Sequence, residues 1–193
     1  MRVYLHELGL ACPLGVGPDA VAQALLAAQP PNVLKTDERW LGARIPVAQV
    51  PDHALPGYAL PAPWLAHSGR TPQLLWLAAQ QIEAAVQTAR ARHGAHRVGL
   101  VLGTSTSGIH EAGLAMAQCM REGHFPVDYD YRQQLLDQPA QCLAAYWGLR
   151  GPGQTIATAC TSSAQALSNA RRLLRLGVCD VVICGGVHGL SDL

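Results

Sequence analysis

The feature of the sequence that most restricts the fold is a strand, a helix and a second strand joined almost without spacers near the carboxyl end. Residues 155–159 are predicted to form a short strand, residues 161–176 a helix, and residues 180–184 (DVVIC) an apolar strand that is followed by two glycines. A helix between two strands is the usual crossover that makes the strands parallel. This βαβ unit predicts an α/β fold with a mostly parallel sheet.

Two further segments are predicted to be strands. Residues 98–104 form a continuous apolar run, which is typical of a parallel strand buried on both faces. Residues 2–10 have the pattern of an opening strand, followed by a turn at residues 12–15. The chain stops at Leu193 with no closing helix after the 180–184 strand, although a parallel sheet needs both faces covered. We therefore expect the sheet to be incomplete at the carboxyl end.

Helical periodicity marks several of the intervening segments. Pro18 announces one helix, because proline is tolerated in a first turn, and apolar residues recur at helical spacing over residues 74–89, which predicts one long helix. Residues 109–121 and 133–147 are predicted to be helices of an insertion between two strands. Residues 29–63 are rich in proline and lack sustained periodicity, so we expect loop with at most short pieces of structure.

Composition argues against several classes of function. With 14 basic and 13 acidic residues, the net charge of +1 gives no reason to expect binding to nucleic acid or to an acidic membrane surface. No apolar run approaches the ~18 residues of a transmembrane helix. The amino-terminal stretch is interrupted by His6 and Glu7, which makes it a poor signal peptide. We therefore expect a soluble, cytoplasmic protein without a membrane span.

The six cysteines are predicted to be free thiols in a reducing compartment. Their spacings include no CxxC pair and no compact disulfide framework. Cys179 and Cys184 lie five residues apart in a strand-like run, so their side chains should point to opposite faces. This placement argues against a metal site.

Cys160 stands at the junction between the predicted 155–159 strand and the 161–176 helix, among small residues that permit a tight turn. The unpaired N–H groups and the positive dipole end of a helix amino terminus favour a thiolate over a thiol. The same N–H groups can stabilise the oxyanion that forms when a thioester is attacked. On this local pattern, a small cysteine that fills the core is the alternative.

Three motifs in order give the chain a family resemblance. Residues 151–167 (GPGQTIATACTSSAQAL) are similar to the active-site signature GP-x-x-T-I-x-T-A-C-x-S-S-A of the β-ketoacyl-acyl-carrier-protein synthases, which are condensing enzymes of the thiolase superfamily. Residues 98–109 resemble the family's second strand and its glycine-rich exit, and residues 1–15 resemble its opening strand and turn. The resemblance implies a thiolase-like α-β-α lobe, with residues 1–193 forming a truncated amino-terminal synthase domain.

The resemblance also implies a reaction, a decarboxylative Claisen condensation in fatty acid or polyene biosynthesis. Cys160 would take an acyl group from acyl-acyl carrier protein (acyl-ACP), and a carbanion formed from malonyl-ACP by loss of CO₂ would attack that thioester. Family members supply two histidines and usually a lysine from the carboxy-terminal half, and no histidine here lies in a similar motif. The 193-residue chain alone is therefore expected to be inactive. No cofactor is implied, and the implied partners are ACP and a second subunit, identical or related.

Four further residues are interpreted by the same resemblance. Ser107 and Ile109 follow the second predicted strand and are expected to line the acyl pocket. Arg70 matches a position where relatives carry basic residues that meet ACP, and an ordinary solvated arginine is the alternative. His188 stands where the family more often has an acidic residue, and we interpret it as a loop substitution without a catalytic role.

Several alternatives stay open. A thiolase or a CoA-primed synthase would share the fold, a chain-length-factor-like partner subunit usually lacks the nucleophile, and the chain is also compatible with an inactive fragment. Residues 128–131 (DYDY) and the 104–108 loop resemble the enzymes of aryl-polyene pathways. Acyl-chain length and pathway are not determined by the sequence, because much of the pocket is expected beyond residue 193.

Overall fold

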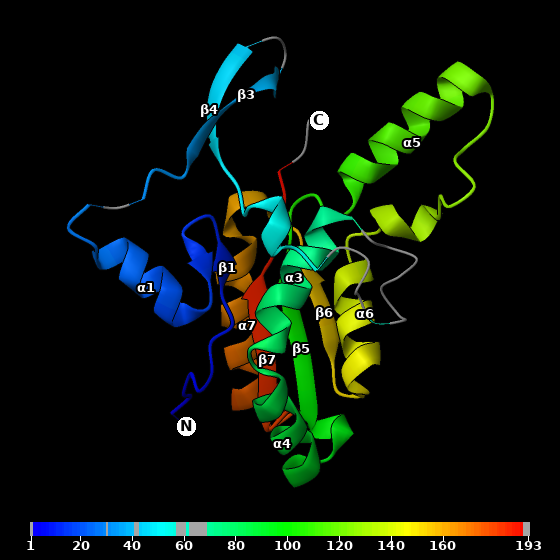
Figure 1. The fold of residues 1–193 in the computed structure, drawn as a ribbon. Helices are drawn as coiled ribbons and strands as arrows, with labels where there is room; N and C mark the ends of the chain where they lie inside the picture. The colour runs from blue at the N-terminus through cyan, green and yellow to red at the C-terminus, as the bar shows by residue number, and fades with distance from the viewer. Residues whose placement is uncertain (1, 30, 41–42, 57–60, 62–68, 191–193) are drawn as a thin grey trace.

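A computed structural model describes residues 2–29, 31–40, 43–56, 61 and 69–190 of the chain. At its centre lies a three-stranded parallel sheet in the order β6-β5-β7. Its strands are β5 (Val98–Gly103), β6 (Gly153–Ile156) and β7 (Val181–Gly186). All three strands run in the same direction, so their carboxyl ends meet at one edge of the sheet (Figure 1).

Helices cover both faces of this sheet (Figure 1). Helix α7 (Ser162–Arg175) connects β6 to β7 and packs against one face, while α3 (Arg70–Gln80), α4 (Glu83–His93) and α6 (Gln138–Trp147) lie on the other. This arrangement is the α-β-α sandwich with a parallel sheet that the sequence predicts. The βαβ unit at its carboxyl end is confirmed.

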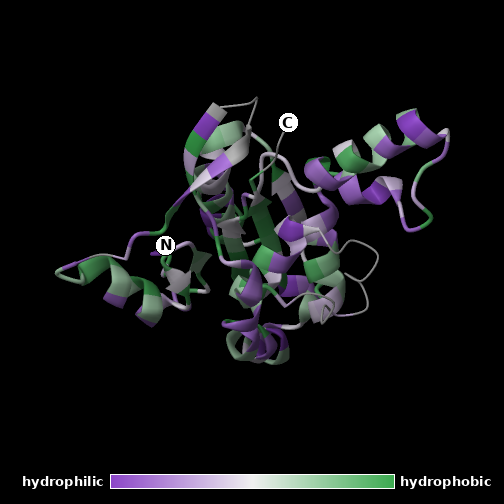
Figure 2. Ribbon diagram, turned by 45° about the horizontal axis from the view of Figure 1, so that its top comes forward, coloured by the Kyte–Doolittle hydropathy of each residue, from purple (hydrophilic) through white to green (hydrophobic). Residues whose placement is uncertain are grey.

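Strand β5 is the centre of the core because it has a strand on each side and a helical layer on each face. Its six residues are all buried, as predicted for residues 98–104. Leu100 and Leu102 pack with Trp76 and Trp147 from the helices of one layer. Figure 2 shows mainly hydrophobic strands at the centre, beside helices that carry both hydrophobic and hydrophilic residues.

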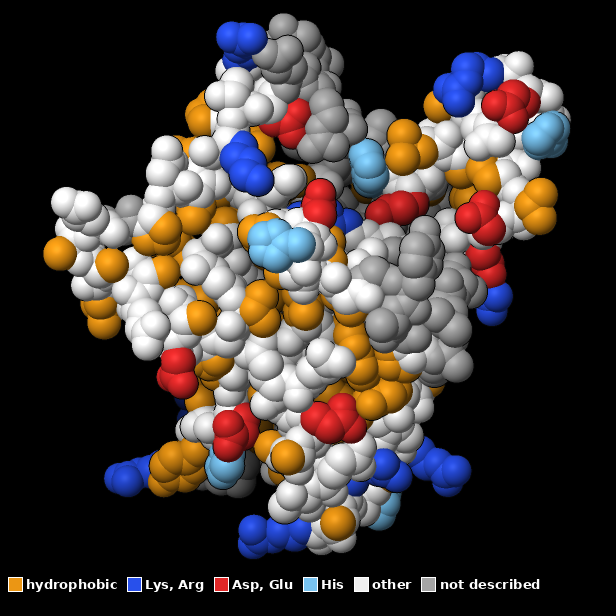
Figure 3. All heavy atoms as spheres, in the orientation of Figure 1, with side chains coloured by type: hydrophobic (Ala, Val, Ile, Leu, Met, Phe, Trp, Pro, Cys, Tyr) orange, Lys and Arg blue, Asp and Glu red, His pale blue; other side chains and the backbone are white. Residues whose placement is uncertain are grey.

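The connection from β5 to β6 is the helical insertion expected from the sequence. It contains α5 (Ile109–Glu122), a short 3-10 turn (Tyr131–Gln134) and α6. Helix α5 projects away from the sandwich (Figure 1), and its Leu114 and Met120 are 59% and 82% exposed. Figure 3 shows apolar and charged side chains mixed over this projecting arm.

The predicted opening strand at residues 2–10 is wrong, because these residues form no strand in the structure. A strand requires strand partners for its main-chain groups, whereas Leu10 is bonded to Gln81 and Gly17. Its N–H donates to Gln81 Oε1 and its carbonyl accepts from Gln81 Nε2, both at 3.0 Å, and the carbonyl also accepts from the Gly17 N–H at 2.8 Å. The predicted turn at residues 12–15 is present between two short strands, β1 (Ala11–Cys12) and β2 (Gly15–Val16). Helix α1 (Pro18–Leu26) follows, with its proline in the first turn as predicted.

The proline-rich stretch predicted as loop contains an antiparallel hairpin. Its strands are β3 (Leu34–Trp40) and β4 (Ala43–Ala48), and Pro46 of β4 lies opposite Thr36. The two strands pair only with each other among the described strands, so each has a free edge where a proline without an N–H is tolerated. Short 3-10 turns follow β4 and α4, at Asp52–Ala54 and Ala95–Arg97.

The long helix predicted over residues 74–89 is two helices, α3 and α4. The break falls at Gln81 and Ile82, where Ile82 leaves the helical conformation at φ −108° and ψ 6°. The side chain of Gln81 donates to the Leu77 carbonyl at 2.7 Å while it also holds Leu10. The helix is therefore interrupted where Gln81 contacts Leu10, and the apolar periodicity of residues 74–89 does not reveal this break.

An ion pair joins the amino ends of β5 and β7. Arg97 donates from Nε and Nη2 to the two carboxylate oxygens of Asp180, at 2.8 and 2.9 Å. These hydrogen bonds hold the pKa of Asp180 below its ordinary value. Within the described part of the chain, no helix is both long and apolar enough to cross a membrane.

Candidate active site

Cys160 lies in the one-turn 3-10 helix Ala159–Thr161, which leads directly into α7. Its side chain is exposed, which contradicts the alternative of a core-filling cysteine. Strand β6 ends at Ile156, earlier than the predicted 155–159 strand, and it lies at the edge of the described sheet rather than at its centre. The predicted position of Cys160 at the amino terminus of a helix is confirmed.

The turn that presents Cys160 is strained at the residue before it. Ala159 has φ 52°, in the left-handed region that residues with a Cβ rarely occupy. Such conformations cost about 1–3 kcal/mol and persist only where surrounding contacts impose them. The small side chain of Ala159 suits a sharp elbow that brings the next residue outward.

The Ser162 hydroxyl stabilises this elbow through hydrogen bonds. Its hydroxyl is fully buried and accepts from the Thr158 N–H at 2.9 Å. The hydroxyl hydrogen faces two carbonyl oxygens, those of Ala159 at 2.7 Å and Thr104 at 3.1 Å. The Ser162 side chain thus links Thr158 and Ala159, which precede Cys160, to Thr104 at the end of β5.

Helix α7 rests on the main chain of β5 at Gly103. A Cβ at this position would lie 2.5 Å from the carbonyl carbon of Ser162 and 2.7 Å from the nitrogen of Ser163, so only glycine allows the approach. Main-chain hydrogen bonds also connect the carboxyl ends of the three strands. The Thr104 N–H donates to the Ile156 carbonyl, and the Val187 N–H donates to the Gly103 carbonyl, both at 2.9 Å.

The amino terminus of α7 has no side-chain cap, because its N-cap residue, Thr161, makes no side-chain hydrogen bond to the first turn. The Ser162 N–H donates to the Ala159 carbonyl of the preceding 3-10 turn. The dipole of α7 favours negative charge at this end of the helix. An exposed thiol here can form a covalent bond to a carbonyl, and unpaired main-chain N–H groups are the kind of donor that stabilises the resulting oxyanion.

Three other cysteines are less exposed than Cys160: Cys142 and Cys179 are buried, and Cys184 is half-buried. Burial raises the pKa of Cys142 to about 11, and it also raises the pKa values of Cys179 and Cys184. Cys142 additionally accepts a hydrogen bond from Gln138 Nε2 at 2.8 Å. Buried thiols of raised pKa are poor nucleophiles, so these three cysteines are structural.

An open hollow of about 470 Å³ lies between the insertion and the strand that precedes Cys160. Its lining residues come from both segments: Tyr131, Gln134, Leu135, Leu136, Asp137, Thr155 and Ala157. Ser107 contacts this wall from behind, because its hydroxyl donates to the Leu135 carbonyl at 3.0 Å. Ser107 is buried at φ 45°, and Ile109 is 42% exposed at the start of α5.

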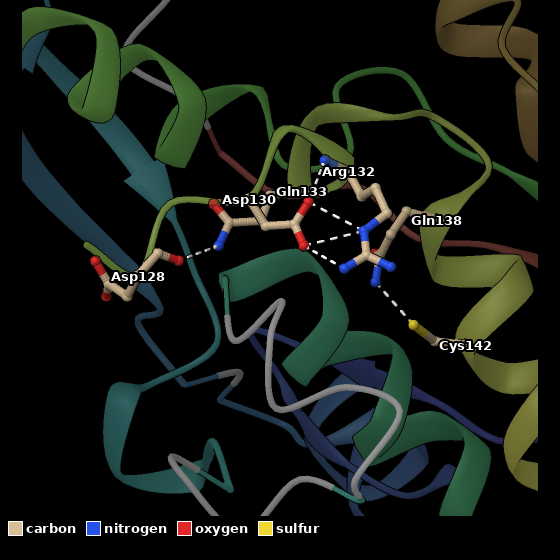
Figure 4. A network of polar contacts seen from close by, with 6 residues as sticks. All are labelled: Asp128, Asp130, Arg132, Gln133, Gln138 and Cys142. Atoms are coloured by element: carbon tan, nitrogen blue, oxygen red, sulfur yellow. Dashed lines mark hydrogen bonds and ion pairs between the residues drawn. The ribbon is translucent and has the colours of Figure 1, made fainter. Parts of the chain in front are cut away.

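The insertion beside this hollow is ordered by local polar contacts. Figure 4 shows Arg132 spanning both carboxylate oxygens of Asp130, with Nε 3.0 Å from each. Asp130 also accepts from the Arg132 main-chain N–H at 2.9 Å, and Gln133 Nε2 donates to the Asp128 carbonyl at 3.4 Å. The DYDY segment therefore forms a defined turn at the edge of the hollow.

The other residues singled out in the sequence lie elsewhere or have unexpected contacts. Arg70 begins α3, and its guanidinium forms an ion pair with Asp52 and donates to the Val50 carbonyl. His188 lies at the same sheet edge as Cys160 and is within 3.1 Å of both Ser105 and Ser163. No local sequence pattern signals this contact, because its three residues are far apart along the chain. Among the described residues, no group of three or more His, Cys, Asp or Glu side chains is placed to hold a metal ion.

The fold is an α-β-α sandwich that presents an exposed cysteine on a strained elbow directly before a helix. Residues 70–192 match the family model described as the N-terminal domain of β-ketoacyl synthase. The chain therefore belongs to the β-ketoacyl synthase family.

Relatives by sequence include two bacterial synthases. The chain is 32% identical over 98 residues to 3-oxoacyl-(acyl-carrier-protein) synthase 1 of Haemophilus influenzae, an alignment that covers 49% of this chain and 24% of the relative. It is 26% identical over 114 residues to the protein of the same name from Buchnera aphidicola, covering 58% and 28%.

A solved structure matches the fold over nearly the whole chain. It is the ketosynthase ApeO in complex with its chain length factor ApeC from Xenorhabdus doucetiae, with a TM-score of 0.86 and 35% identity. The match covers 98% of this chain and 47% of the matched chain. The chain thus spans about half the length of its structural relative and a smaller part of the two synthases.

Proposed function

We propose that residues 1–193 form the amino-terminal half of a β-ketoacyl-ACP synthase, an acyltransferase in which Cys160 carries the acyl chain. The observation that supports this role is the exposed Cys160 on the strained Ala159 elbow, directly before α7. The small neighbours of Cys160, the helix that begins directly after it and the buried Ser162 that holds the turn are consistent with an exposed, fixed nucleophile.

The proposed reaction has two steps. The Cys160 thiol loses its proton, and the thiolate attacks the carbonyl of acyl-ACP. The C–S bond to Cys160 forms, the C–S bond to ACP breaks, and the departing ACP thiolate takes up a proton in place of the one that Cys160 released. Malonyl-ACP then loses CO₂, and the resulting carbanion attacks the acyl-Cys160 carbonyl and releases the Cys160 thiolate and β-ketoacyl-ACP. In both steps, unpaired N–H groups at the start of α7 would stabilise the oxyanion. The family resemblance places the groups that assist decarboxylation outside residues 1–193, so we propose that the chain alone does not condense substrates.

We propose that the acyl chain occupies the hollow beside β6. Apolar side chains of Leu135 and Leu136 contribute to it, and Thr155 and Ala157 connect it to the segment that leads to Cys160. Ser107 would fix the wall through its bond to Leu135. Ile109, at the start of α5, is not among the residues that line this hollow, and its proposed place in the acyl pocket rests on the family resemblance.

The proposed partners are ACP and a second synthase subunit, identical or related. The ApeO structure supports a paired arrangement, because it is described as a ketosynthase in complex with its chain length factor. Arg70 is the proposed ACP contact; its pairing with Asp52 means that an acidic partner must compete with an internal carboxylate. The six cysteines form no disulfide with one another, which supports the proposal of a reducing, cytoplasmic location.

A non-catalytic, chain-length-factor-like subunit is the second candidate, because the matched structure contains such a subunit. Retention of an exposed cysteine at the elbow favours the catalytic role. The two candidates differ in one measurable property, the transfer of an acyl group to Cys160.

Acyl transfer is tested by incubating the complete protein with acyl-ACP and locating the acyl group by peptide mapping and mass spectrometry. We expect the acyl group on Cys160, no transfer to Cys160→Ala, and normal transfer to Cys119→Ala, which removes a half-buried cysteine on α5. Acylation that persists in Cys160→Ala would refute the proposed nucleophile. No acylation of the wild-type protein would favour the non-catalytic subunit.

A further inference from the structure

The imidazole of His188 bridges two serine hydroxyls at the edge of the sheet where Cys160 lies. His188 Nδ1 is 3.1 Å from Ser105 Oγ, and His188 Nε2 is 3.1 Å from Ser163 Oγ. Ser105 is the second residue after β5, His188 is the second residue after β7, and Ser163 is the second residue of α7. The bridge therefore joins three segments that meet only in the folded protein.

Both contacts are satisfied at the same time. In a neutral imidazole one ring nitrogen donates and the other accepts, and a serine hydroxyl can take either role. Both ring nitrogens of His188 are therefore hydrogen-bonded within the bridge. This occupancy distinguishes His188 from a catalytic base, which needs a nitrogen directed at substrate.

Gly186 fixes the direction of the Ser163 hydroxyl. A Cβ at Gly186 would lie 1.9 Å from Ser163 Oγ and 3.3 Å from His188 Nε2, so the hydroxyl and the ring occupy the space above a glycine. On its other side, the first turn of α7 rests on Gly103 of β5. The first turn of α7 therefore packs against both Gly103 and Gly186, and the His188 bridge holds Ser163 over Gly186.

We infer that His188 is a positioning residue for the nucleophile, an inference that rests on the proposed role of Cys160. Ser163 follows Cys160 by three residues, which is about one helical turn, so a restraint on Ser163 restrains the turn that presents the sulfur. His188 acts through Ser163 and Ser105, and it touches neither the thioester nor the carbanion.

The test compares single-turnover acylation of Cys160 by acyl-ACP in variants of the complete protein. His188→Leu removes both polar contacts at similar size. His188→Gln places an amide group at about the distance of Nε2 from the main chain, and His188→Asn at about the distance of Nδ1. Ser163→Ala removes the partner on α7. His124→Leu, on the exposed connection after α5, is the matched control.

We expect His188→Leu and Ser163→Ala each to slow acylation about fivefold, the factor that corresponds to one hydrogen bond of ordinary strength. The double variant should be no slower than either single variant, because both remove the same contact. His188→Gln should restore more of the rate than His188→Asn, which a general effect on stability would not reproduce. His124→Leu should match the wild type.

Two kinds of result would overturn the inference. Wild-type rates in both His188→Leu and Ser163→Ala, or additive losses in the double variant, would show that the bridge does not position Cys160 although acylation occurs. Absence of acylation in the wild-type protein would instead refute the nucleophile role itself, and with it the positioning role. The first result leaves the proposed function intact, so the two failures are distinguishable.

Discussion

Replacing Gly103 by alanine tests whether the nucleophile depends on the main-chain contact beneath it. The added Cβ would lie 2.5 Å from the carbonyl carbon of Ser162, whereas ordinary contacts begin at 3.4 Å. The opposing atoms belong to the main chain, so no flexible side chain can turn away to make room. The first turn of α7 must therefore move by about 0.9 Å, or the end of β5 must bend by a similar amount.

A displacement of this size has two expected consequences. Moving a reacting group by about 1 Å lowers a rate by roughly 100-fold, and overpacking a well-packed contact costs about 1–3 kcal/mol of stability. We expect Gly103→Ala to slow acylation of Cys160 by about 100-fold in a single-turnover mass-spectrometric assay. Denaturant titration should show a folded protein with its free energy of unfolding lowered within that range.

Gly185→Ala is the control for this prediction. Gly185 lies in β7 opposite Leu102 of β5, and an added Cβ there meets no atom within 4 Å. This variant should acylate at the wild-type rate. If Gly103→Ala also acylated at the wild-type rate, the reasoning that α7 is seated by its contact with Gly103 would be refuted.

Three other predictions concern stability and completeness. Leu100→Ala, at a side chain only 1% exposed in the apolar cluster, should lower the free energy of unfolding by about 2–5 kcal/mol in a urea titration, and a loss below about 1 kcal/mol would contradict the described core. Bonding to Arg97 lowers the pKa of Asp180, so the ion pair should stabilise the fold above the ordinary pKa of 3.8 and lose this effect as the pH falls further. The melting temperature of the wild type should therefore fall as the pH is lowered through this range, and it should fall less steeply in Asp180→Asn. An equal fall in both proteins would count against the ion pair. The 193-residue chain alone should form no β-ketoacyl-ACP from acyl-ACP and malonyl-ACP by mass spectrometry, whereas turnover at the rate of a complete synthase would show that it needs no further residues.

The parts of the fold that the sequence predicts are those whose signals are local. Strand β5 is a continuous apolar run, and α7 begins directly after the small residues around Cys160, so both were expected close to their observed positions. The strand-to-helix junction at Cys160 is visible within a few residues, but this local pattern also fits a core-filling cysteine, and it is the resemblance of residues 151–167 to a family signature that makes Cys160 the nucleophile candidate. Its place on an outer strand depends on sheet order, which local pattern does not contain.

The parts that were missed depend on partners far away in the sequence. Residues 2–10 have a strand-like pattern but no ladder, since Leu10 pairs with the side chain of Gln81, 71 residues later. The break between α3 and α4 falls at that same glutamine. The β3–β4 hairpin was hidden by prolines that free strand edges tolerate. The contacts of His188 reach back 83 and 25 residues, so no window of sequence could have indicated them.

The strained elbow at Ala159 has a consequence for how the protein folds. Its left-handed conformation is opposed by local energetics, and Ser162, which bonds to the Ala159 carbonyl, also donates to the carbonyl of Thr104, 58 residues before Ser162. Contacts between such distant residues form only after the chain has closed a long loop, so the elbow takes shape with the sheet and not before it. A chain in which β5 has not yet docked would present Cys160 on a relaxed turn. The time at which Cys160 acquires its native reactivity during refolding thus reports the assembly of the whole sheet.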